Sequence, residues 1–359
     1  MKSVKLAILG QGRSGWSIHG AHLLKDTERF QVVAVVDALP ERRAKAAEAF
    51  GCDTYEDYTA LFGRTDIDLV INALPSFLHP PVTIDLLEHG FNVLTEKPMA
   101  RTAAQVDAMI DASVRSGKKL AVFQQSRFVP YFLKVKEVIA SGKLGRIVQI
   151  SISFDGYARR WDWQCLQENT GGNLYNTGPH PLDQALNLLD DVEHMPTVFC
   201  KMDRALTYGD AEDYVKLILT APGKPLIDLS ISSCNAYPTG IYNVQGTRGG
   251  LSGDAKSLKW RYFDPEKAQA QHLIRTPLTT ADGEPAYCVE TLPWQEESWS
   301  AQEHETAFNS AVRVFYDGLY AHLVHDEPLS VTPQVRQQIA VAELCHRMNP
   351  LSTLEKEAE

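Results

Sequence analysis

Three glycines near the start of the chain have the spacing of a turn that can hold a phosphate. An apolar run at residues 6–9 leads directly into Gly10, Gly12 and Gly15, and an amphipathic segment follows at residues 16–24. This pattern predicts a strand, a tight turn and the start of a helix. Gly10 lets the chain turn sharply, Gly12 lets the backbone approach a pyrophosphate, and Gly15 lets helix and strand pack closely. Free amide N–H groups at the helix N-terminus would then bind the anion.

An acidic residue completes the pattern of a dinucleotide site. A second apolar run, at residues 31–36, ends in Asp37, which lies 22 residues past Gly15. A carboxylate that accepts hydrogen bonds from the adenosine ribose is expected roughly 20 residues past the glycines. Alone, the glycines also fit a βα loop without ligand, and Asp37 also fits an acid that caps the helix near Pro40. Strand, glycines and acid together favour dinucleotide binding.

A parallel sheet is needed to position these residues. Apolar strands alternate with helices in the first third of the chain, with strands predicted at residues 6–9, 31–36, 67–71, 91–94 and 119–123 and helices at 16–24, 40–50, 82–88 and 102–117. This alternation implies right-handed crossovers and an α/β fold with a doubly wound parallel sheet. We therefore predict a Rossmann dinucleotide-binding domain at residues 1–124.

The pattern changes after residue 124. A helix is predicted at residues 131–140, and β-rich segments follow at 147–154, 197–206, 214–221, 226–233 and 242–247. Strands joined without helices predict an α+β domain with a large, mostly antiparallel open sheet. Two late helices are predicted at residues 304–325 and 334–348, and the last can pack back on the first domain. We assign residues 125–359 to substrate binding and oligomerisation.

Composition excludes several classes of partner. The formal net charge is −10 and no basic run is present, which argues against nucleic acid or an anionic membrane. No apolar run approaches the ~20 residues of a membrane span, and a core strand begins within a few residues of Met1. The cysteines lie far apart, without a CxxC pair, which indicates a reducing compartment and no metal site. We expect a cytoplasmic protein. The six cysteines are Cys52, Cys165, Cys200, Cys234, Cys288 and Cys345.

Several motifs resemble the Gfo/Idh/MocA family of NAD(P)-dependent oxidoreductases, which includes glucose–fructose oxidoreductase and inositol dehydrogenases. The motifs are ILGQGRSG, NALPSFLH, TEKPMA, QQSRFVP and GGNLYNTGPHPLD. They span residues 8–183, and the later α+β pattern is also similar. The combination of TEKP at a strand end with the GPHPLD stretch is the most specific part of the resemblance.

The resemblance implies that Lys97 lies beside the nicotinamide and the reacting hydroxyl. A cation there can hydrogen-bond the substrate oxygen and stabilise an alkoxide as hydride leaves the carbon. Pro98 follows Lys97, and the family often has a cis bond at this place, which would aim Lys97 inward. Without the resemblance, Glu96 and Lys97 would be taken for a surface ion pair.

A second group of catalytic residues lies in the stretch at residues 171–183. If a helix begins near Asp183, then His180 lies at its N-terminal entrance, where the helix dipole disfavours imidazolium. His180 is then a neutral base that can take a hydroxyl proton, although a buried structural histidine is the alternative. Asn176 stands where the family commonly has an aspartate. Because asparagine cannot titrate, Asn176 can only orient the substrate, and proton transfer falls to His180 with Lys97.

Other candidate residues follow from their position beside these motifs. Ser76 and His79 come after the loop at residues 72–75 and resemble adenosine-side and ribose contacts, although His79 also fits a satisfied loop histidine. Gln125 and Arg127 can anchor the nicotinamide carboxamide and a polar substrate. The residues expected to contact the cofactor are Gly10, Gly12, Arg13, Ser14, Gly15, Asp37, Arg42, Leu74, Pro75, Ser76, His79, Glu96, Lys97 and Gln125.

An aromatic and cationic cluster lies between a predicted strand and the catalytic stretch. Tyr157, Arg159, Arg160, Trp161 and Trp163 form it. Aromatic faces stack on sugar C–H surfaces, so the cluster can form a carbohydrate lid, and a packed plug between domains is the alternative. The tract at residues 290–296 suits packing or an oligomer edge. The residues expected to contact substrate are Lys97, Arg127, Tyr157, Trp161, Trp163, Asn176 and His180.

The resemblance implies hydride transfer between a nicotinamide cofactor and a secondary hydroxyl of a sugar, sugar derivative or cyclitol. Asp37 favours NAD because it would repel a 2′-phosphate, although Arg42 and Arg43 can accommodate NADP. Redox-neutral glycoside cleavage or epimerisation is one alternative. A cofactor-dependent sensor with weak catalysis is another, indicated by Asn176. We expect a homodimer or homotetramer built on the second sheet, whose open face would otherwise expose apolar surface.

Overall fold

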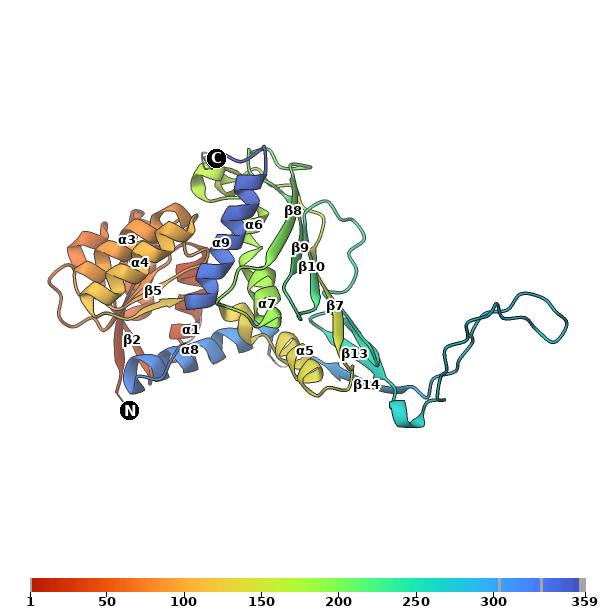
Figure 1. Ribbon diagram of the computed structural model, residues 1–359. Helices are drawn as coiled ribbons and strands as arrows, with labels where there is room; N and C mark the ends of the chain where they lie inside the picture. The colour runs from red at the N-terminus through yellow and green to blue at the C-terminus, as the bar shows by residue number, and fades with distance from the viewer. Residues whose placement is uncertain (1, 303–304, 330–331, 355–359) are drawn as a thin grey trace.

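The computed structural model describes residues 2–302, 305–329 and 332–354, and two β-sheets form its framework (Figure 1). The first sheet has six parallel strands in the order β3-β2-β1-β4-β5-β6, with the order reversing between β1 and β4. This order is that of a doubly wound dinucleotide-binding sheet. The strands are β1 (Val4–Leu9), β2 (Phe30–Val36), β3 (Asp53–Tyr55), β4 (Leu69–Asn72), β5 (Val93–Thr95) and β6 (Leu120–Val122).

Helices connect these strands and end where the sequence indicates. Pro40 begins α2, and Gly51 ends it in a left-handed conformation. Thr102 and Gln105 form a capping box at the start of α4. The helical segments are η1 (Arg13–Gly20), α1 (Ala21–Leu23), α2 (Pro40–Phe50), η2 (Tyr58–Leu61), η3 (Ser76–Leu78), α3 (His79–Glu88), α4 (Ala103–Ser116) and η4 (Gln125–Phe128).

The second sheet has eight strands in the order β14-β13-β12-β11-β7-β10-β9-β8, and only β7 and β10 pair in parallel. Its predicted, mostly antiparallel character is confirmed. The strands are β7 (Ile147–Asp155), β8 (Thr197–Asp203), β9 (Tyr214–Thr220), β10 (Leu226–Ser232), β11 (Tyr242–Gly246), β12 (Gly249–Gly253), β13 (Ser257–Tyr262) and β14 (Gln295–Ser300). The last three were not predicted as strands, and the tract at residues 290–296 leads into the outermost of them.

Helices cover one face of the second sheet and fill the space between the two sheets (Figure 1). Side chains of α5, α7 and α9 form one core with the inward residues of the second sheet. Helix α8 packs instead on the first sheet, with Phe315, Tyr316 and Leu319 in the core beneath β1 and β2. The helical segments are α5 (Pro130–Ala140), η5 (Trp163–Cys165), η6 (Gln167–Asn169), α6 (Asn173–Asn176), α7 (Pro179–Leu189), η7 (Pro265–Lys267), α8 (Ala307–His325) and α9 (Thr332–Met348).

The C-terminal helices join the two sheets. Helix α9 contacts α4 and β6 on one side and α7 and β8 on the other. The start predicted for α8, residue 304, lies outside the described residues, and the helix runs from Ala307. Within the described part of the chain, no helix is long and apolar enough to cross a membrane. The division of the chain at residue 124 stays a proposal.

The open face of the second sheet carries charged and polar side chains beside exposed apolar ones such as Phe199 of β8, so it is a mixed surface and not the apolar face expected from the sequence. Lys216 of β9 forms an ion pair there with Asp228 of β10. Asn243 and Gln245 of β11 and Lys259 of β13 also point outward and are exposed. Alternation along the strands places the fully buried apolar residues inward and most of the polar residues outward.

Candidate active site

The glycine-rich turn has the geometry that its sequence predicts. Gly10 has φ +82°, and a Cβ there would lie 2.6 Å from the carbonyl oxygen of Ala73. A Cβ on Gly15 would lie 1.7 Å from the carbonyl oxygen of Gly10, so only glycine lets the helix pack this closely. A Cβ on Gly12 would meet nothing within 4 Å, so the backbone is open at this point.

The first residues after Gly12 form a wide helical turn. The N–H of Ala21 donates to the carbonyl of Trp16, five residues earlier, as in a π-helix. Arg13 is exposed and Ser14 is partly buried at the start of this turn. The first amides of any helix have no intrahelical acceptor, so the turn offers free N–H donors to an anion.

Asp37 is buried at the end of β2 and already holds the turn in place. Its carboxylate accepts the N–H of Gln11 at 2.6 Å and the N–H of Leu39 at 2.9 Å. The Arg42 guanidinium lies 3.5 Å from the same carboxylate and is itself half exposed. Asp37 therefore shapes the glycine turn, and the remaining lone pairs of its carboxylate are what a ribose can reach.

Unpartnered polar atoms support the fit to a nicotinamide dinucleotide. Gln125 is buried, and its side-chain oxygen has no hydrogen-bond partner among the described residues. It lies just past β6, at the carboxyl end of the parallel sheet, where such folds bind their ligands. A carboxamide NH₂ is a suitable donor to this oxygen. The open backbone at Gly12 and the free oxygen of Gln125 both fit the dinucleotide.

Glu96 is buried beneath the site. Its carboxylate accepts the N–H of Lys97 at 3.0 Å and lies 3.3 Å from the Nε2 atom of His19, whose Nδ1 atom lies 2.7 Å from the Tyr316 hydroxyl. Burial acts to raise the pKa of Glu96, but the contact with His19 and the charge of Lys97 outweigh it and lower the pKa to about 2. Glu96 is thus an ionised anchor for the Lys97 backbone, and the sequence did not indicate His19 or Tyr316 as its partners.

Lys97 links the two halves of the molecule. The Lys97–Pro98 bond is cis, as the resemblance implied, and Lys97 Nζ donates to the backbone oxygen of Asn176 at 2.9 Å. Desolvation lowers the pKa of Lys97, and the charges of Arg13 and Arg160 add to that effect while Glu96 opposes it. The lysine predicted from the first sheet and the stretch predicted at residues 171–183 therefore meet.

His180 lies in the first turn of α7, close enough to Lys97 for their charges to interact. Burial of the imidazole, together with the charge of Lys97, lowers the pKa of His180 to about 3. The Nδ1 atom is buried without a hydrogen-bond partner among the described residues. The side-chain amide of Gln124 donates to the carbonyl of Pro179 and fixes this turn beside β6. His180 is therefore a neutral imidazole with a free nitrogen.

Asn176 ends α6 and faces the segment at residues 157–165. Its side-chain nitrogen donates to Gln164 in a long hydrogen bond of 3.4 Å, and Arg160 donates to the same Gln164 oxygen. Arg160 also pairs with Asp162 at 2.7 Å. Trp161 is 78% exposed, so this segment is not a packed plug between domains. Tyr157 and Trp163 are also exposed, which leaves their rings free to contact a ligand.

Two predicted contact residues have other partners. His79 is buried, with Nδ1 2.7 Å from the carbonyl oxygen of Pro98 and Nε2 2.9 Å from that of Leu74. A neutral imidazole donates to one of these two carbonyls, and the ring lies between Leu74 and the segment after Lys97. Arg127 forms a buried two-pronged ion pair with Asp183 on α7. Of the loop that His79 supports, Pro75 is exposed and Ser76 partly buried.

One buried acid beside Asn176 was missed. Glu212 precedes β9 and accepts the N–H of Leu174 at 2.8 Å, at the start of α6. It lines a small hollow of about 10 Å³ together with Asn176 and Gln164. Burial raises the pKa of Glu212 to about 8. The sequence gives little signal for this role, because an acid before a strand usually lies on the surface.

Glu212→Gln is expected to stabilise the protein at neutral and alkaline pH. The folded-state pKa of Glu212 is raised above that of the unfolded chain. The contribution of Glu212 to the stability of the parent protein is therefore fully present below about pH 4.5 and is lost as pH rises through about 8. At ~1.4 kcal/mol per pKa unit, the resulting destabilisation by Glu212 is on the order of 5 kcal/mol. Thermal melts from pH 5 to 9 should show a widening Tm difference, with exposed Glu48→Gln as the control. Parallel curves would contradict this account.

These features define a class of protein. A six-stranded Rossmann sheet with a glycine-rich turn, joined to a second sheet whose covering helix α7 carries a neutral histidine, is the architecture of a two-part nicotinamide-dependent oxidoreductase. Residues 4–124 match the model of an oxidoreductase family with an NAD-binding Rossmann fold, and residues 132–252 match the Gfo/Idh/MocA C-terminal domain. The chain belongs to the Gfo/Idh/MocA family of oxidoreductases.

Characterised relatives differ in their chemistry. The chain is 30% identical over 283 residues to an inositol 2-dehydrogenase of Rhizobium meliloti, covering 77% of this chain and 82% of that protein. It is 28% identical over 262 residues to a 2,7-anhydro-N-acetylneuraminate hydratase of Mediterraneibacter gnavus, covering 71% and 68%. The aldose-aldose oxidoreductase of Caulobacter crescentus has the same fold, with a TM-score of 0.74, 22% identity, and coverage of 96% and 97%.

Proposed function

We propose that the protein transfers a hydride between a nicotinamide cofactor and a secondary hydroxyl of a sugar, sugar derivative or cyclitol. One observation carries the proposal: Lys97 Nζ, which follows the first sheet, donates to the backbone oxygen of Asn176, and its charge acts on the neutral His180 of α7. A cation and a neutral base close to each other are the two groups that oxidation of an alcohol requires.

Each residue has a separate task in this proposal. A bound nicotinamide supplies the hydride acceptor. His180 takes the hydroxyl proton on its free nitrogen, and Lys97 hydrogen-bonds the same oxygen as negative charge develops on it. The Asn176 side chain, which has only a long bond to Gln164, orients a neighbouring hydroxyl. The exposed rings of Trp161 and Trp163 cover a sugar ring.

The names of the relatives support this substrate class. An inositol dehydrogenase and an aldose-aldose oxidoreductase both act on polyhydroxylated rings or chains. Purified protein with NAD or NADP and a panel of sugars, uronic acids and inositols tests the proposal through nicotinamide absorbance. Steady reduction by one class supports it. Cofactor binding without turnover on any member of the panel would favour a sensor.

A redox-neutral reaction is the second candidate, since one relative is named a hydratase. In that case a sugar is oxidised transiently and the cofactor is regenerated in place. A glycoside or anhydro-sugar that is consumed without net nicotinamide reduction would support this candidate. Product analysis by NMR alongside absorbance separates the two reactions.

The cofactor preference gives a further prediction. The Asp37 carboxylate lies where it would repel a 2′-phosphate, so we expect NADH to bind more tightly than NADPH. Asp37→Ala should reduce that preference because Arg42 then loses its acidic partner and is free for the phosphate. Fluorescence titration measures both affinities, with Asp53→Ala on the exposed edge strand β3 as a control. Tighter binding of NADPH to the parent protein would overturn the prediction.

A further inference from the structure

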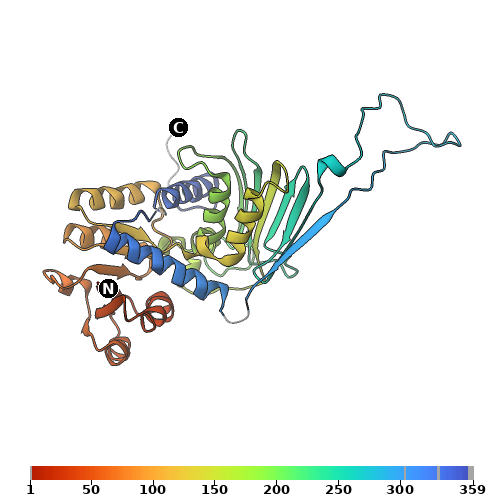
Figure 2. The same cartoon turned by 90° about the horizontal axis from the view of Figure 1, so that it is seen from below.

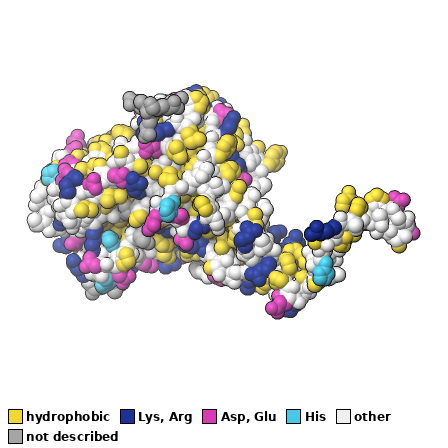
Figure 3. Space-filling model, viewed as in Figure 1, with side chains coloured by type: hydrophobic (Ala, Val, Ile, Leu, Met, Phe, Trp, Pro, Cys, Tyr) yellow, Lys and Arg dark blue, Asp and Glu magenta, His cyan; other side chains and the backbone are white. Residues whose placement is uncertain are grey.

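A long arm leaves the second sheet between its two outermost strands. It comprises residues 263–294, which connect β13 to β14. Figures 1 and 2 show it projecting away from the body, on the side of the sheet opposite to the helices. Figure 3 shows it standing clear of the molecule, with apolar side chains along it. No residue that we assign to the cofactor or the substrate lies in this segment.

The arm is not packed against its own chain. Leu273 is 82% exposed, Tyr287 90% and Val289 91%. The described contacts between the two limbs are few: Ala286 N–H donates to the Leu278 carbonyl near the tip, and the Gln271 side chain donates to Glu290 nearer the base. Between them lies a hollow of about 460 Å³, lined by Leu273, Ile274, Leu278, Ala286, Tyr287 and Cys288. An isolated two-stranded ribbon is marginally stable, so these apolar side chains need something to cover them.

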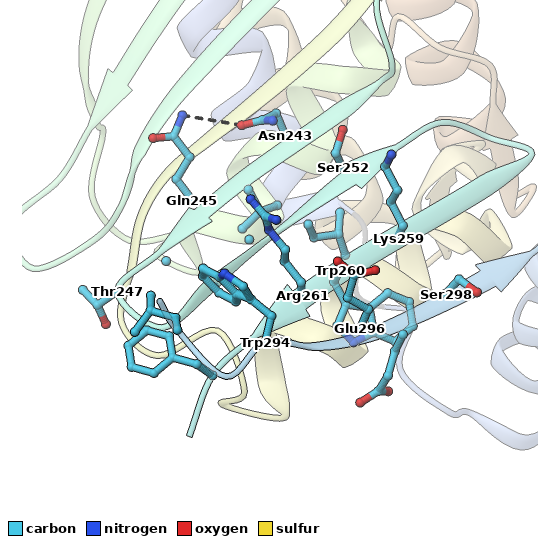
Figure 4. A pocket seen from close by; sticks show the side chains of 18 residues that line it. Asn243, Gln245, Thr247, Ser252, Lys259, Trp260, Arg261, Trp294, Glu296 and Ser298 are labelled. Atoms are coloured by element: carbon cyan, nitrogen blue, oxygen red, sulfur yellow. Dashed lines mark hydrogen bonds between the residues drawn. The ribbon is translucent and has the colours of Figure 1, made fainter. Parts of the chain in front are cut away.

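A groove continues from the base of the arm onto the open face of the sheet. It has a volume of about 950 Å³. Arg261 lies 4.8 Å from the ring centroid of Trp294, and Phe263 packs edge-to-face on the same ring. Figure 4 shows Asn243, Ser252 and Lys259 beside them on neighbouring strands. A protein that binds to the open face would therefore contact the arm as well.

The open face has the size of a protein interface. Eight strands spaced at about 4.8 Å, each roughly 20 Å long, give a face of roughly 700 Å². A standard interface buries about 800 Å² on each partner. The face carries both signs of charge, with Lys216 and Asp228 in a pair and Lys259, Arg261 and Glu296 nearby. A surface of mixed sign and this size suits a copy of itself better than a uniformly charged partner.

Association of two copies through the open face is the homo-oligomer already expected from the sequence. Beyond it, we propose that the arm clasps the second copy. The two copies are related by a two-fold axis, so each arm reaches across to the other body and covers its own exposed apolar residues there. The arm is long enough for this: the 16 residues from 265 to 281 reach at most about 50 Å, and a partner's sheet and helix layers are together roughly 20 Å thick.

Substitutions on the arm test the proposal through the molecular mass of the protein in solution. The parent protein should be a dimer or larger in sedimentation velocity. Leu273→Asp with Val289→Asp should raise the dissociation constant by roughly 100-fold, counting a tenfold loss for each buried apolar anchor. Val114→Asp is the matched control, because Val114 is an equally exposed apolar residue on α4, and it should change nothing. NADH affinity, which depends on the first sheet, checks that each variant is folded.

Hydrogen exchange on the unmodified protein gives a second measurement that no folding defect can affect. Amides at residues 270–290 should become protected as concentration rises through the dimer dissociation constant. A parent protein that is monomeric at all concentrations would overturn the proposal. An oligomer that keeps its dissociation constant in the double variant, with an unprotected arm, would also overturn it, while leaving association through the sheet face intact.

Discussion

Lys97→Ala is expected to lower turnover by about 10²–10⁴-fold, the usual contribution of a positioned acid–base group. The Lys97 side chain donates to the backbone oxygen of Asn176 and its charge acts on His180, so the substitution removes a cation that is fixed beside the proposed base. The affinity for NADH should stay nearly unchanged, because pyrophosphate binding depends on the turn from Gly10 to Gly15. Stopped-flow kinetics and fluorescence titration measure the two effects separately.

Two variants sharpen this test. Lys25→Ala removes an exposed lysine at a distance from the cleft and should leave both quantities unchanged. Lys97→Arg keeps the charge, but its planar head cannot replace a compact ammonium in a confined site, so it should recover little activity. Full activity of Lys97→Ala on an established substrate would refute the assignment of Lys97.

The alkaline side of the rate profile follows from the same residue. Desolvation and the nearby arginines lower the pKa of Lys97 from its ordinary value of 10.5. The cationic form of Lys97 is the active one. Activity should therefore fall as pH rises, and the midpoint of this fall should lie below pH 10.5. This limb should be absent in Lys97→Ala.

The glycine turn was predictable because its backbone demands are local. A positive φ at Gly10 and the close approach at Gly15 can be met by one residue type only, so the sequence states them directly. The cis bond after Lys97 came from the resemblance, because a proline alone does not specify the isomer. A structural feature can be predicted most directly from the sequence where its backbone geometry allows one residue type only.

Strands that depend on their neighbours could not be predicted. Strand β3 has only three residues and pairs only with β2, and β12 is rich in glycine. Strand β14 is polar at nearly every position. Such segments are extended because adjacent strands offer hydrogen bonds, and their own propensity is low.

Side-chain partners in the site were also beyond the sequence. Glu96 and His19 are far apart in the chain, and their contact depends on how η1 packs on β5. Arg127 was expected to face the substrate, but it is held by Asp183, which is fully buried. A buried carboxylate requires a charged partner, and only the fold reveals which acid is buried.

His180→Ala is expected to lower turnover by about the same 10²–10⁴-fold, because the cleft then lacks its neutral base. The unpartnered Nδ1 atom marks His180 as the proton acceptor, and the lowered pKa keeps the imidazole unprotonated at neutral pH. Added imidazole should restore part of the activity of His180→Ala, since the small base can enter the space that the side chain leaves. His194→Ala, which removes an exposed histidine, is the control.

The acid side of the rate profile gives the sharper result. A histidine with its ordinary pKa near 6.5 would lose its function below neutral pH. Burial and the charge of Lys97 lower the pKa of His180 to about 3, so it stays neutral and active from pH 8 down to about pH 4. For the parent enzyme, kcat/KM should therefore remain level down to about pH 4 and fall below it as the imidazole takes up a proton. An inflection near pH 6.5 that disappears in His180→Ala would mean that His180 is solvated, and the proposed neutral base would have to be abandoned.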